Sequence, residues 1–318
     1  MVSYRVLGYI TTYKLPGLSK YALKSLSGVV DKIVYAIVDY QESNEDLFSE
    51  CFDLSDEVIK YRSNIGYCKA INVALSYAIE EGYDFVLVLN SDAMINQDTI
   101  PEIISHMDTC KHIVAQPMIV KIDEHGNKTD LLDCAGIMFE YGENMSFERG
   151  YGKFVSRWIG KKIDEIPEVV DEVPAVSGAV SVYNLRAVKR VGYLWERLWS
   201  LCDEMEYGWR AYKHGYRCLY VGTVEGYHFR CYSCLCNVVS KELERLWRSL
   251  EWRNTTLIYR RHGSEYQIRK TYECLCPIIK ENTFPRICVE ALVNDNLYRE
   301  MEKKVRELFI SAGVSSVC

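Results

Sequence analysis

Short apolar runs alternate with amphipathic segments in the first part of the chain. The spacing of apolar residues predicts strands over 4–10, 32–38, 57–61 and 85–89, and helices over 18–26 and 68–80. Strands that alternate with helices indicate an α/β fold, with a mixed, mostly parallel sheet flanked by helices. The run over 85–89 is unbroken and rich in Val and Leu, which suits a strand buried on both faces.

The rest of the chain has a less regular pattern. Further strands are predicted over 113–122, 131–140, 173–183 and 217–221, and further helices over 98–107, 185–191 and 205–214. Residues 141–172 carry many charges and glycines, so we predict a loop there. From Ser240 the pattern is helical and basic. We therefore divide the chain into an α/β domain over 1–235 and a C-terminal helical extension over 236–318.

Polar residues follow the first strands at the points where the strands end. They include Thr11, Asp39, Asn64, Asn90 and Asp92. Ligands of open α/β sheets bind at the carboxyl ends of the strands. Asp92, with Asn90 beside it, is a candidate ligand of Mg²⁺ or Mn²⁺, because these ions take one or two carboxylates together with phosphate oxygens. A solvated aspartate in a turn is the alternative.

Three acids, Asp203, Glu204 and Glu206, lie within one turn at the start of a predicted helix. Bulky apolar residues such as Trp195 precede them, so we expect part-buried carboxyls whose raised pKa values suit general-base work. Glu206 and Arg210 are four residues apart and can pair. The alternative is that the acids only begin a helix, where the helix dipole favours negative charge.

His228 follows the strand that comes after this acidic helix. It can therefore return to the same edge of the sheet as Asp92. A neutral imidazole there is a candidate third or fourth metal ligand, and a purely structural histidine is the alternative.

The 13 cysteines include two close groups, Cys231/Cys234/Cys236 and Cys274/Cys276, with Cys288 further on. Their spacing is not that of a common zinc module. Zinc half-sites, disulfides that pin the C-terminal helices and buried free thiols all remain open.

Composition excludes some classes of protein. A net charge of −6 and a pI near 5.7 argue against nucleic-acid binding. No apolar stretch reaches the ~18 residues that cross a bilayer, and the N-terminus lacks the pattern of a secretory signal. We expect a cytoplasmic protein. The basic, Trp-bearing helices after Ser240 could lie on an anionic membrane, pack on the core or form a homodimer, and these alternatives remain open.

Nucleotide-binding and protease motifs of other classes are missing from the sequence. The chain has no G-x-x-x-x-G-K loop, no G-x-G-x-x-G and no H-E-x-x-H. These absences argue against a P-loop nucleotide hydrolase, a dinucleotide-dependent oxidoreductase and that class of metalloprotease.

Taken in order, these stretches resemble the family 2 glycosyltransferases, notably their rhamnosyltransferase-like branch, over about residues 4–262. Thr11 to Lys14 is similar to the opening V-T-Y-N, Asp39 to the second-strand Asp, Asn64-Ile65-Gly66-Tyr67 with Asn72 to N-x-G-f…N, and Asn90-Ser91-Asp92 to N-P-D or D-x-D. Val176 to Ala179 is similar to s-G-a, Asp203 to Glu206 with Arg210 to E-D-x-D-l-x-x-R, His228 to a late His, and Arg253-Asn254 to R-N.

This resemblance implies a GT-A fold and an inverting glycosyltransferase. Such an enzyme moves a sugar from a nucleotide-diphosphate sugar to a hydroxyl of a glycan or lipid-linked acceptor, with Mg²⁺ or Mn²⁺ on the diphosphate. Glu204 stands at the position of the catalytic base, with Asp203 as the substitute candidate. The metal ligands implied are Asp92 and His228. The donor-binding residues implied are Thr11, Tyr13, Asp39, Asn64, Gly66, Asn72, Asn90, Asp92, Gly178, Glu206 and Arg210.

The sequence departs from the family pattern at three places. Asp203-Glu204 inverts the usual order of the two acids, Trp195 stands where an Asp is usual, and Asn90-Ser91-Asp92 offers one acid where some relatives have two. A non-catalytic nucleotide-sugar-binding protein of the same fold is therefore the alternative function. A nucleotidyltransferase is disfavoured, because no Gly-rich basic loop follows the first strand.

Overall fold

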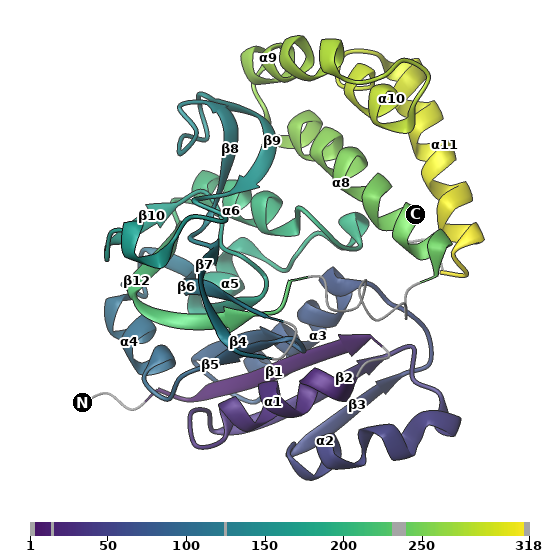
Figure 1. Ribbon diagram of the computed structural model, residues 1–318. Helices are drawn as coiled ribbons and strands as arrows, with labels where there is room; N and C mark the ends of the chain where they lie inside the picture. Colours follow the sequence, from purple (N-terminus) through teal and green to yellow (C-terminus); the bar gives the residue numbers. More distant parts are fainter. Residues whose placement is uncertain (1–3, 14–15, 124–125, 231–239, 315–318) are drawn as a thin grey trace.

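The computed structural model describes residues 4–13, 16–123, 126–230 and 240–314. A large twisted sheet runs through the molecule, and helices cover both of its faces (Figure 1). Along its main path the strand order is β10-β12-β6-β11-β4-β1-β2-β3, with β5 paired to β12 and β7 to β6. The strands are β1 (Val6–Tyr13), β2 (Lys32–Val38), β3 (Glu57–Tyr61), β4 (Phe85–Asn90), β5 (Ala93–Ile95), β6 (His112–Ile122), β7 (Lys128–Cys134), β10 (Val170–Val173), β11 (Val180–Asn184) and β12 (Arg217–His228).

Most strands of this path point the same way. β3, β2, β1 and β4 are parallel neighbours, and β6 and β12 are parallel to each other. β11 lies antiparallel between β4 and β6, so β6 keeps the direction of β4. Only β11 and the edge strand β10 run against the others on the main path of described strands. The predicted α/β class with a mostly parallel sheet is confirmed.

Alternate side chains of the central strands supply two separate apolar layers. In β1, Leu7 and Tyr9 face one layer while Val6 and Ile10 face the other, as the two-residue period of a strand requires. The first layer packs on α3 (Tyr67–Glu80), α5 (Leu185–Val191) and α6 (Asp203–Lys213). The second packs on α1 (Pro16–Leu26), α2 (Ser49–Asp53) and α4 (Thr99–His106). β4 lies at the centre, which explains its unbroken apolar sequence.

The predicted C-terminal helical extension is also present. It contains α8 (Lys241–His262), α9 (Glu265–Leu275), α10 (Phe284–Glu290) and α11 (Asp295–Ser311), which stand together beside the sheet (Figure 1). Short 3₁₀ turns occur at η1 (Glu42–Phe48), η2 (Ile163–Glu165), η3 (Glu196–Leu198) and η4 (Cys276–Ile278). Ser240 begins α8 by accepting a hydrogen bond from the Leu243 N–H.

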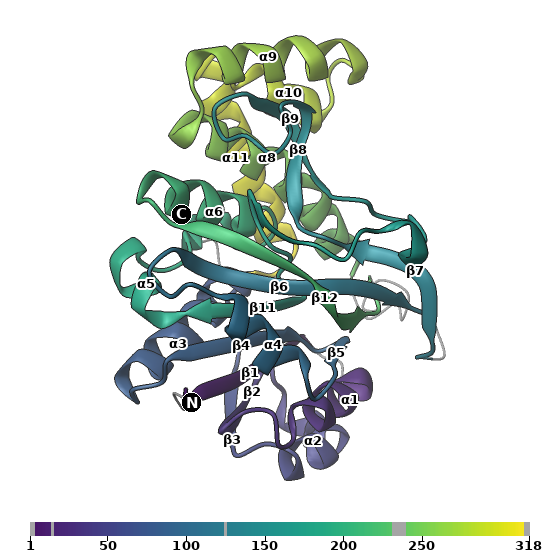
Figure 2. The ribbon, with the colours of Figure 1, turned by 90° about the vertical axis from the view of Figure 1, so that its left-hand side faces the viewer.

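The prediction of a loop over residues 141–172 is wrong. It contains β9 (Gly150–Ser156), which pairs with β8 (Ile137–Gly142), and it ends in β10. This two-stranded unit rises from the main sheet towards α9 (Figure 2). Gly150, one of the glycines that suggested a loop, is instead a packing site, because a Cβ there would come within 2.3 Å of the Phe139 ring.

Several strand boundaries also differ from the prediction. The strand expected over 131–140 splits at Gly136, whose φ of +100° lets the chain leave β7 and enter β8. The strand expected over 173–183 is two strands, β10 and β11, which lie in different parts of the sheet. Thr11 to Tyr13 continue β1 and do not form a turn, since Thr and Tyr suit a strand. β12 continues to His228 through a register shift after Val221.

The division of the chain at residue 235 stays a prediction, because that boundary lies outside the described residues. The first apolar layer includes Leu257, Ile258 and Tyr259 of α8 together with residues of the sheet. Strand β9 is tied to the extension as well, because the Gly152 N–H donates to Thr271 Oγ1 at 3.0 Å and the Tyr259 hydroxyl donates to Gly152 O at 3.0 Å. Within the described residues, none of the helices has the length and apolar character needed to span a bilayer.

The bond between β9 and α9 predicts a stability effect. Thr271→Val removes the acceptor of a buried N–H, which should lower the free energy of unfolding by about 1–3 kcal/mol. The matched control is Thr255→Val, which removes a buried hydroxyl that donates to Glu251 O of its own helix. Urea unfolding of both variants measures the difference. Equal losses would mean that the β9–α9 contact contributes nothing of its own.

Candidate functional site

A cavity of about 410 Å³ opens at the carboxyl ends of the central strands. Seven of the predicted site residues line it: Thr11, Tyr13, Asn64, Gly66, Asn90, Asp92 and His228. A second hollow of about 680 Å³, lined by residues such as Lys128 and Ile166, contains none of them. We therefore place the candidate site in the smaller cavity, where the predicted residues meet.

One backbone hydrogen bond joins the two halves of the site. The Asn90 N–H at the end of β4 donates to Ala179 O at 2.9 Å, so Asp92 lies close to the turn at Gly178. The Gly178 N–H in turn points at Glu204 Oε1, 3.3 Å away. The hydroxyl of Tyr67, which lines the cavity, donates to Gly178 O at 2.9 Å. The chain segments that carry the strand-end acid and the helix acid thus meet at one edge of the sheet.

Asp92 faces an alternating row of charges. His228 Nε2 is 3.4 Å from Asp92 Oδ1, and His228 Nδ1 is 2.9 Å from Asp133 Oδ2. Arg230 Nε lies 2.7 Å from the other oxygen of Asp133. Burial alone would lower the pKa of His228, but hydrogen bonds to Asp133 and Asp92 outweigh it and raise the pKa to about 9. His228 is therefore an imidazolium at neutral pH when only these two carboxylates face it.

Asp92 and His228 fit a divalent cation that shares its coordination with phosphate. Among the described residues, no group of three His, Cys, Asp or Glu side chains is arranged to hold a metal ion by itself. Mg²⁺ and Mn²⁺ need only one or two protein ligands when phosphate oxygens and water complete the shell. Asp133 on Nδ1 directs His228 Nε2 towards Asp92, which is the usual support of a metal-binding imidazole.

The acids at the start of α6 have different environments. Asp203 is 2% exposed, and its Oδ2 finds no hydrogen-bond partner within the described ranges. Glu204 is half-buried and faces Gly178. Burial raises the pKa of both carboxyls, and the charge of Glu204 raises that of Asp203 further. Neither acid is among the residues that line the cavity, and Glu204 is the more exposed of the two.

Glu206 and Arg210 form the predicted pair, but they lie away from the cavity. Glu206 is fully buried and accepts from Arg210 Nη2 at 2.9 Å, while His262 Nε2 lies 3.0 Å from its Oε1. Burial opposes ionisation of Glu206, yet His262 and Arg210 lower its pKa. Arg210 also donates to Val191 O and Tyr193 O. The pair joins α6, α8 and the turn after α5, so the geometry supports positioning and gives no contact with a donor.

Three other predicted residues shape the backbone near the site. Asn72 is buried and exchanges hydrogen bonds with the backbone of Leu194, away from the cavity lining. Asn64 Oδ1 accepts from the Gly66 N–H at 3.1 Å and sets the turn before α3. Asp39 follows β2 with a φ of +61° and is not among the cavity-lining residues.

Gly66 is required for two reasons. Its φ is +80°, a region that favours glycine, and a Cβ there would come 2.4 Å from Cδ1 of Trp199. The flat indole of Trp199 therefore lies directly against the backbone that begins α3. This contact closes one side of the cavity.

Other cavity residues were not among the predicted site residues. Tyr67, Trp199, Leu201, Arg230 and Trp247 all line the cavity. Arg230 follows His228 by two residues, and that spacing along a strand end could have suggested it. Trp247 lies on α8, far along the chain, and no local pattern marks it. Trp195, the departure from the family pattern, lies outside the cavity lining, with the Arg261 guanidinium 4.1 Å over its ring.

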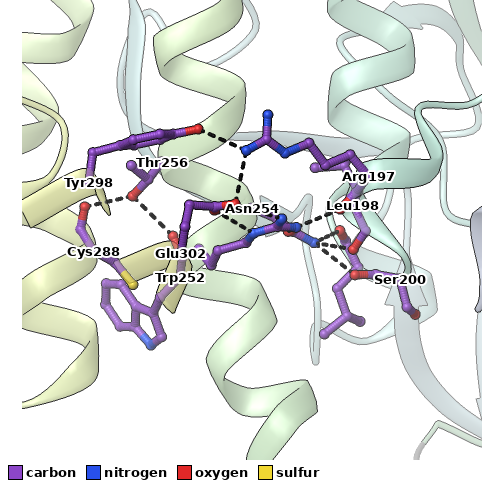
Figure 3. A network of polar contacts seen from close by, with 11 residues as sticks. Arg197, Leu198, Ser200, Trp252, Asn254, Thr256, Cys288, Tyr298 and Glu302 are labelled. Atoms are coloured by element: carbon purple, nitrogen blue, oxygen red, sulfur yellow. Dashed lines mark hydrogen bonds and ion pairs between the residues drawn. The ribbon is translucent and has the colours of Figure 1, made fainter. Parts of the chain in front are cut away.

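The loop that leads into α6 has an unusual backbone. Trp199, Leu201 and Cys202 have φ values of +63°, +70° and +60°. Each such non-glycine residue costs on the order of 1 kcal/mol or more unless its surroundings hold it. The Asn254 amide holds this loop, donating to the carbonyls of Leu198, Ser200 and Leu201 at 2.8–3.0 Å (Figure 3).

A buried ion pair supports Asn254 in turn. Arg253 is 1% exposed, and its Nε lies 3.1 Å from Glu302 Oε1 on α11. It also donates to Arg197 O at 2.6 Å and to Asn254 Oδ1 at 3.1 Å. Glu302 takes a second cation, Arg197 Nη2, at 2.9 Å (Figure 3). The extension therefore fixes the loop that carries the acids of α6.

Only one of the two cysteine groups lies in the part of the chain that the structure describes. Cys231, Cys234 and Cys236 lie outside the described residues. Cys274, Cys276 and Cys288 are free thiols within the described C-terminal helices. For this second group, the described geometry therefore favours the free-thiol interpretation.

Comparison with known proteins places the fold. No protein-family model matches the chain, and no curated protein matches it by sequence. The structure is similar to that of GalNAc-T7 solved with UDP, GalNAc and Mn²⁺, with a TM-score of 0.60 and 12% identity over 98% of this chain. The chain spans 58% of the length of that structure.

It is also similar to S. aureus TarS residues 1–349. The TM-score is 0.51 for the complex with UDP-GlcNAc, with 14% identity over 96% of this chain and 83% of that one. For the complex with UDP the TM-score is 0.50, with 16% identity over 97% of this chain and 88% of that one. These solved structures are GT-A-type glycosyltransferases, and the expected GT-A fold is confirmed.

The support of the loop predicts a local effect of Asn254→Ala. Three carbonyls lose their donor, so we expect the free energy of unfolding to fall by about 1–3 kcal/mol. Hydrogen exchange of the amides of residues 199–203 should also become faster. Thr256→Val is the control, because its hydroxyl joins α8 to Cys288 O and not to the loop. It should lower stability without faster exchange in 199–203, and faster exchange in both variants would contradict this role of Asn254.

The buried acid Asp203 predicts a pH-dependent stability difference. Its pKa is raised in the folded protein, so the folded state holds a proton that the unfolded state releases as the pH rises. Asn cannot ionise, so Asp203→Asn should gain stability relative to the wild type as the pH rises from 5 to 8. Urea midpoints at the two pH values measure this. Parallel pH profiles would mean that Asp203 carries no raised pKa.

Proposed function

We propose that this protein is an inverting glycosyltransferase that moves a sugar from a nucleotide-diphosphate sugar to an acceptor hydroxyl. The finer assignment, to family 2 and its rhamnosyltransferase-like branch, rests on the ordered motifs of the sequence. The acceptor proposed is a glycan or a lipid-linked saccharide. Mg²⁺ or Mn²⁺ is the proposed cofactor, in keeping with the Mn²⁺ of the GalNAc-T7 structure.

One observation carries the proposal. The hydrogen bonds from Asn90 to Ala179 and from Gly178 to Glu204 place two carboxyls of different character at one edge of the sheet. Asp92 stands in a row of charges, and Glu204 stands in a site where burial raises its pKa. Sugar transfer from a diphosphate needs this pairing, with one group to stabilise the leaving anion and one to activate the incoming hydroxyl.

Glu204 acts as the general base in this mechanism. It takes the proton of the acceptor hydroxyl as that oxygen attacks the anomeric carbon, and the bond from that carbon to the diphosphate oxygen breaks. A single displacement through an oxocarbenium-like state inverts the configuration. Only the carboxylate can accept the proton, so activity falls as the pH drops through the raised pKa of Glu204.

The opposite side of the cavity holds the leaving diphosphate. A divalent cation held by Asp92 and His228 would neutralise its developing charge. Arg230 adds a positive guanidinium that is 39% exposed at the cavity and oriented by Asp133. Thr11 and Asn90, at the ends of parallel neighbours β1 and β4, offer hydroxyl and amide groups to the donor.

A donor screen tests the proposal. Thermal shift and release of nucleoside diphosphate are measured with UDP-, GDP- and dTDP-sugars, with and without Mn²⁺. We expect one donor class to stabilise the protein and to be consumed. Tight binding with no turnover for any acceptor would favour the non-catalytic binding protein, and neither binding nor turnover would remove the proposal.

Glu204→Gln provides the sharper prediction. General-base catalysis contributes about 10²–10⁴-fold, so kcat should fall by that factor while the affinity for the donor stays near the wild-type value. The matched control is Glu244→Gln on α8, where the carboxylate pairs with Arg248 at the surface, outside the cavity lining. If both variants retain wild-type kcat, another group must be the base.

A further inference from the structure

The cavity has two unlike walls. The strand ends supply a polar wall that includes Asn90, Asp92 and Arg230. The loop before α6 and helix α8 supply an apolar wall formed by Trp199, Leu201 and Trp247. We call these three residues the apolar wall. A ligand that fits between the two walls needs both a polar and an apolar face.

The apolar wall is built partly by the C-terminal extension. Leu201 is held against α8 through its carbonyl, which accepts from Asn254, and Cys202 Sγ contacts Glu251 O at 3.8 Å. Glu251 is one helical turn after Trp247, so Trp247 lies on the same side of α8 as the residue that contacts Cys202. Leu243, Leu246 and Leu250 occupy the buried stripe of α8, and Trp247 sits at its edge, half-buried.

Two features of the wall indicate a binding surface. Leu201 is 40% exposed and Trp247 is half-buried, although both are large and apolar. The third member, Trp199, is 2% exposed and its indole lies against the backbone of Gly66, so Leu201 and Trp247 provide the accessible apolar surface of the wall.

The position of the wall points to the acceptor side of the reaction. Residues 199–202 run directly into Asp203 and Glu204 at the start of α6. Leu201 is therefore three residues from the proposed base along the chain. The charged groups that suit the diphosphate, Asp92, His228 and Arg230, belong to the polar wall.

We propose that Trp247 and Leu201 form the acceptor subsite and bind the apolar face of a saccharide ring. A pyranose has one face of C–H groups, and such a face packs on an indole. The subsite rests on the proposed glycosyl transfer. It makes the helical extension a part of the active site and makes a saccharide the acceptor class.

Trp247→Ala tests the subsite, because its effect on the KM of the acceptor can be compared with its effect on the KM of the donor. Initial rates are measured with the donor found in the screen and a panel of methyl glycosides of common hexoses and their disaccharides. Loss of the ring contact should raise the acceptor KM about tenfold. The donor KM and the rate of donor hydrolysis by water should stay within about twofold of the wild type.

Two further variants serve as controls. Trp247→Phe keeps an aromatic face and should retain most of the affinity for the acceptor. Trp252→Ala removes another half-buried indole of α8, one that packs on Lys153 and does not line the cavity, and it should leave both KM values unchanged. This second variant accounts for any general loss of stability in the helix.

Three results would overturn the subsite. One is an unchanged acceptor KM in Trp247→Ala, and another is an equal rise in donor KM, which would assign the wall to the nucleotide sugar. The third is a wild-type enzyme that hydrolyses its donor yet transfers to no saccharide of the panel. A protein that neither binds nor consumes any nucleotide sugar is a different failure, because it removes the proposed function together with the subsite.

Discussion

The hydrogen bond from the Asn90 N–H to Ala179 O is the contact on which the site depends. β4 and β11 run antiparallel, and this bond extends their pairing past the end of the register at Leu89. Parallel strands alone would gather polar ends at one edge, but Gly178 and Glu204 come from a later part of the chain. An antiparallel strand inserted at the centre of a parallel sheet brings that later part to the edge where Asp92 lies.

The same edge concentrates groups that are costly to bury. Asp203 has an unpartnered oxygen among the described residues, and three residues before it hold positive φ values. Such features persist only when surrounding structure determines them. Here Asn254 and the Arg253–Glu302 pair do so, and they belong to the extension. The α/β sheet and the C-terminal helices are therefore joined at the loop whose backbone has these unfavourable φ values.

Much of the fold could be predicted from sequence because its signals are local. The apolar runs of the central strands, the helix period of α3 and the basic helical segment after Ser240 are each contained in a few consecutive residues. The loop prediction over 141–172 failed because Gly150 and Gly152 of β9 pack against Phe139 and Tyr141, and the pattern of one sequence does not distinguish such glycines from turn glycines.

The candidate site was predictable to the extent that its residues end strands. Asp92, Asn64 and His228 do so, and they meet in the cavity. Glu206 and Arg210 have the spacing of an ion pair, but this spacing does not reveal which other segment the pair contacts. In the structure, Arg210 of this pair binds the turn after α5. Trp199 and Trp247 join the cavity through packing between distant segments, which no local pattern encodes.

The dependence of the loop before Glu204 on α11 has a consequence for the order of assembly during synthesis. Glu302 leaves the ribosome long after the sheet strands and α6 have emerged, so the nascent α/β portion must wait with its acidic segment unsupported. The Arg253–Glu302 pair that supports this loop can therefore form only after α11 has emerged.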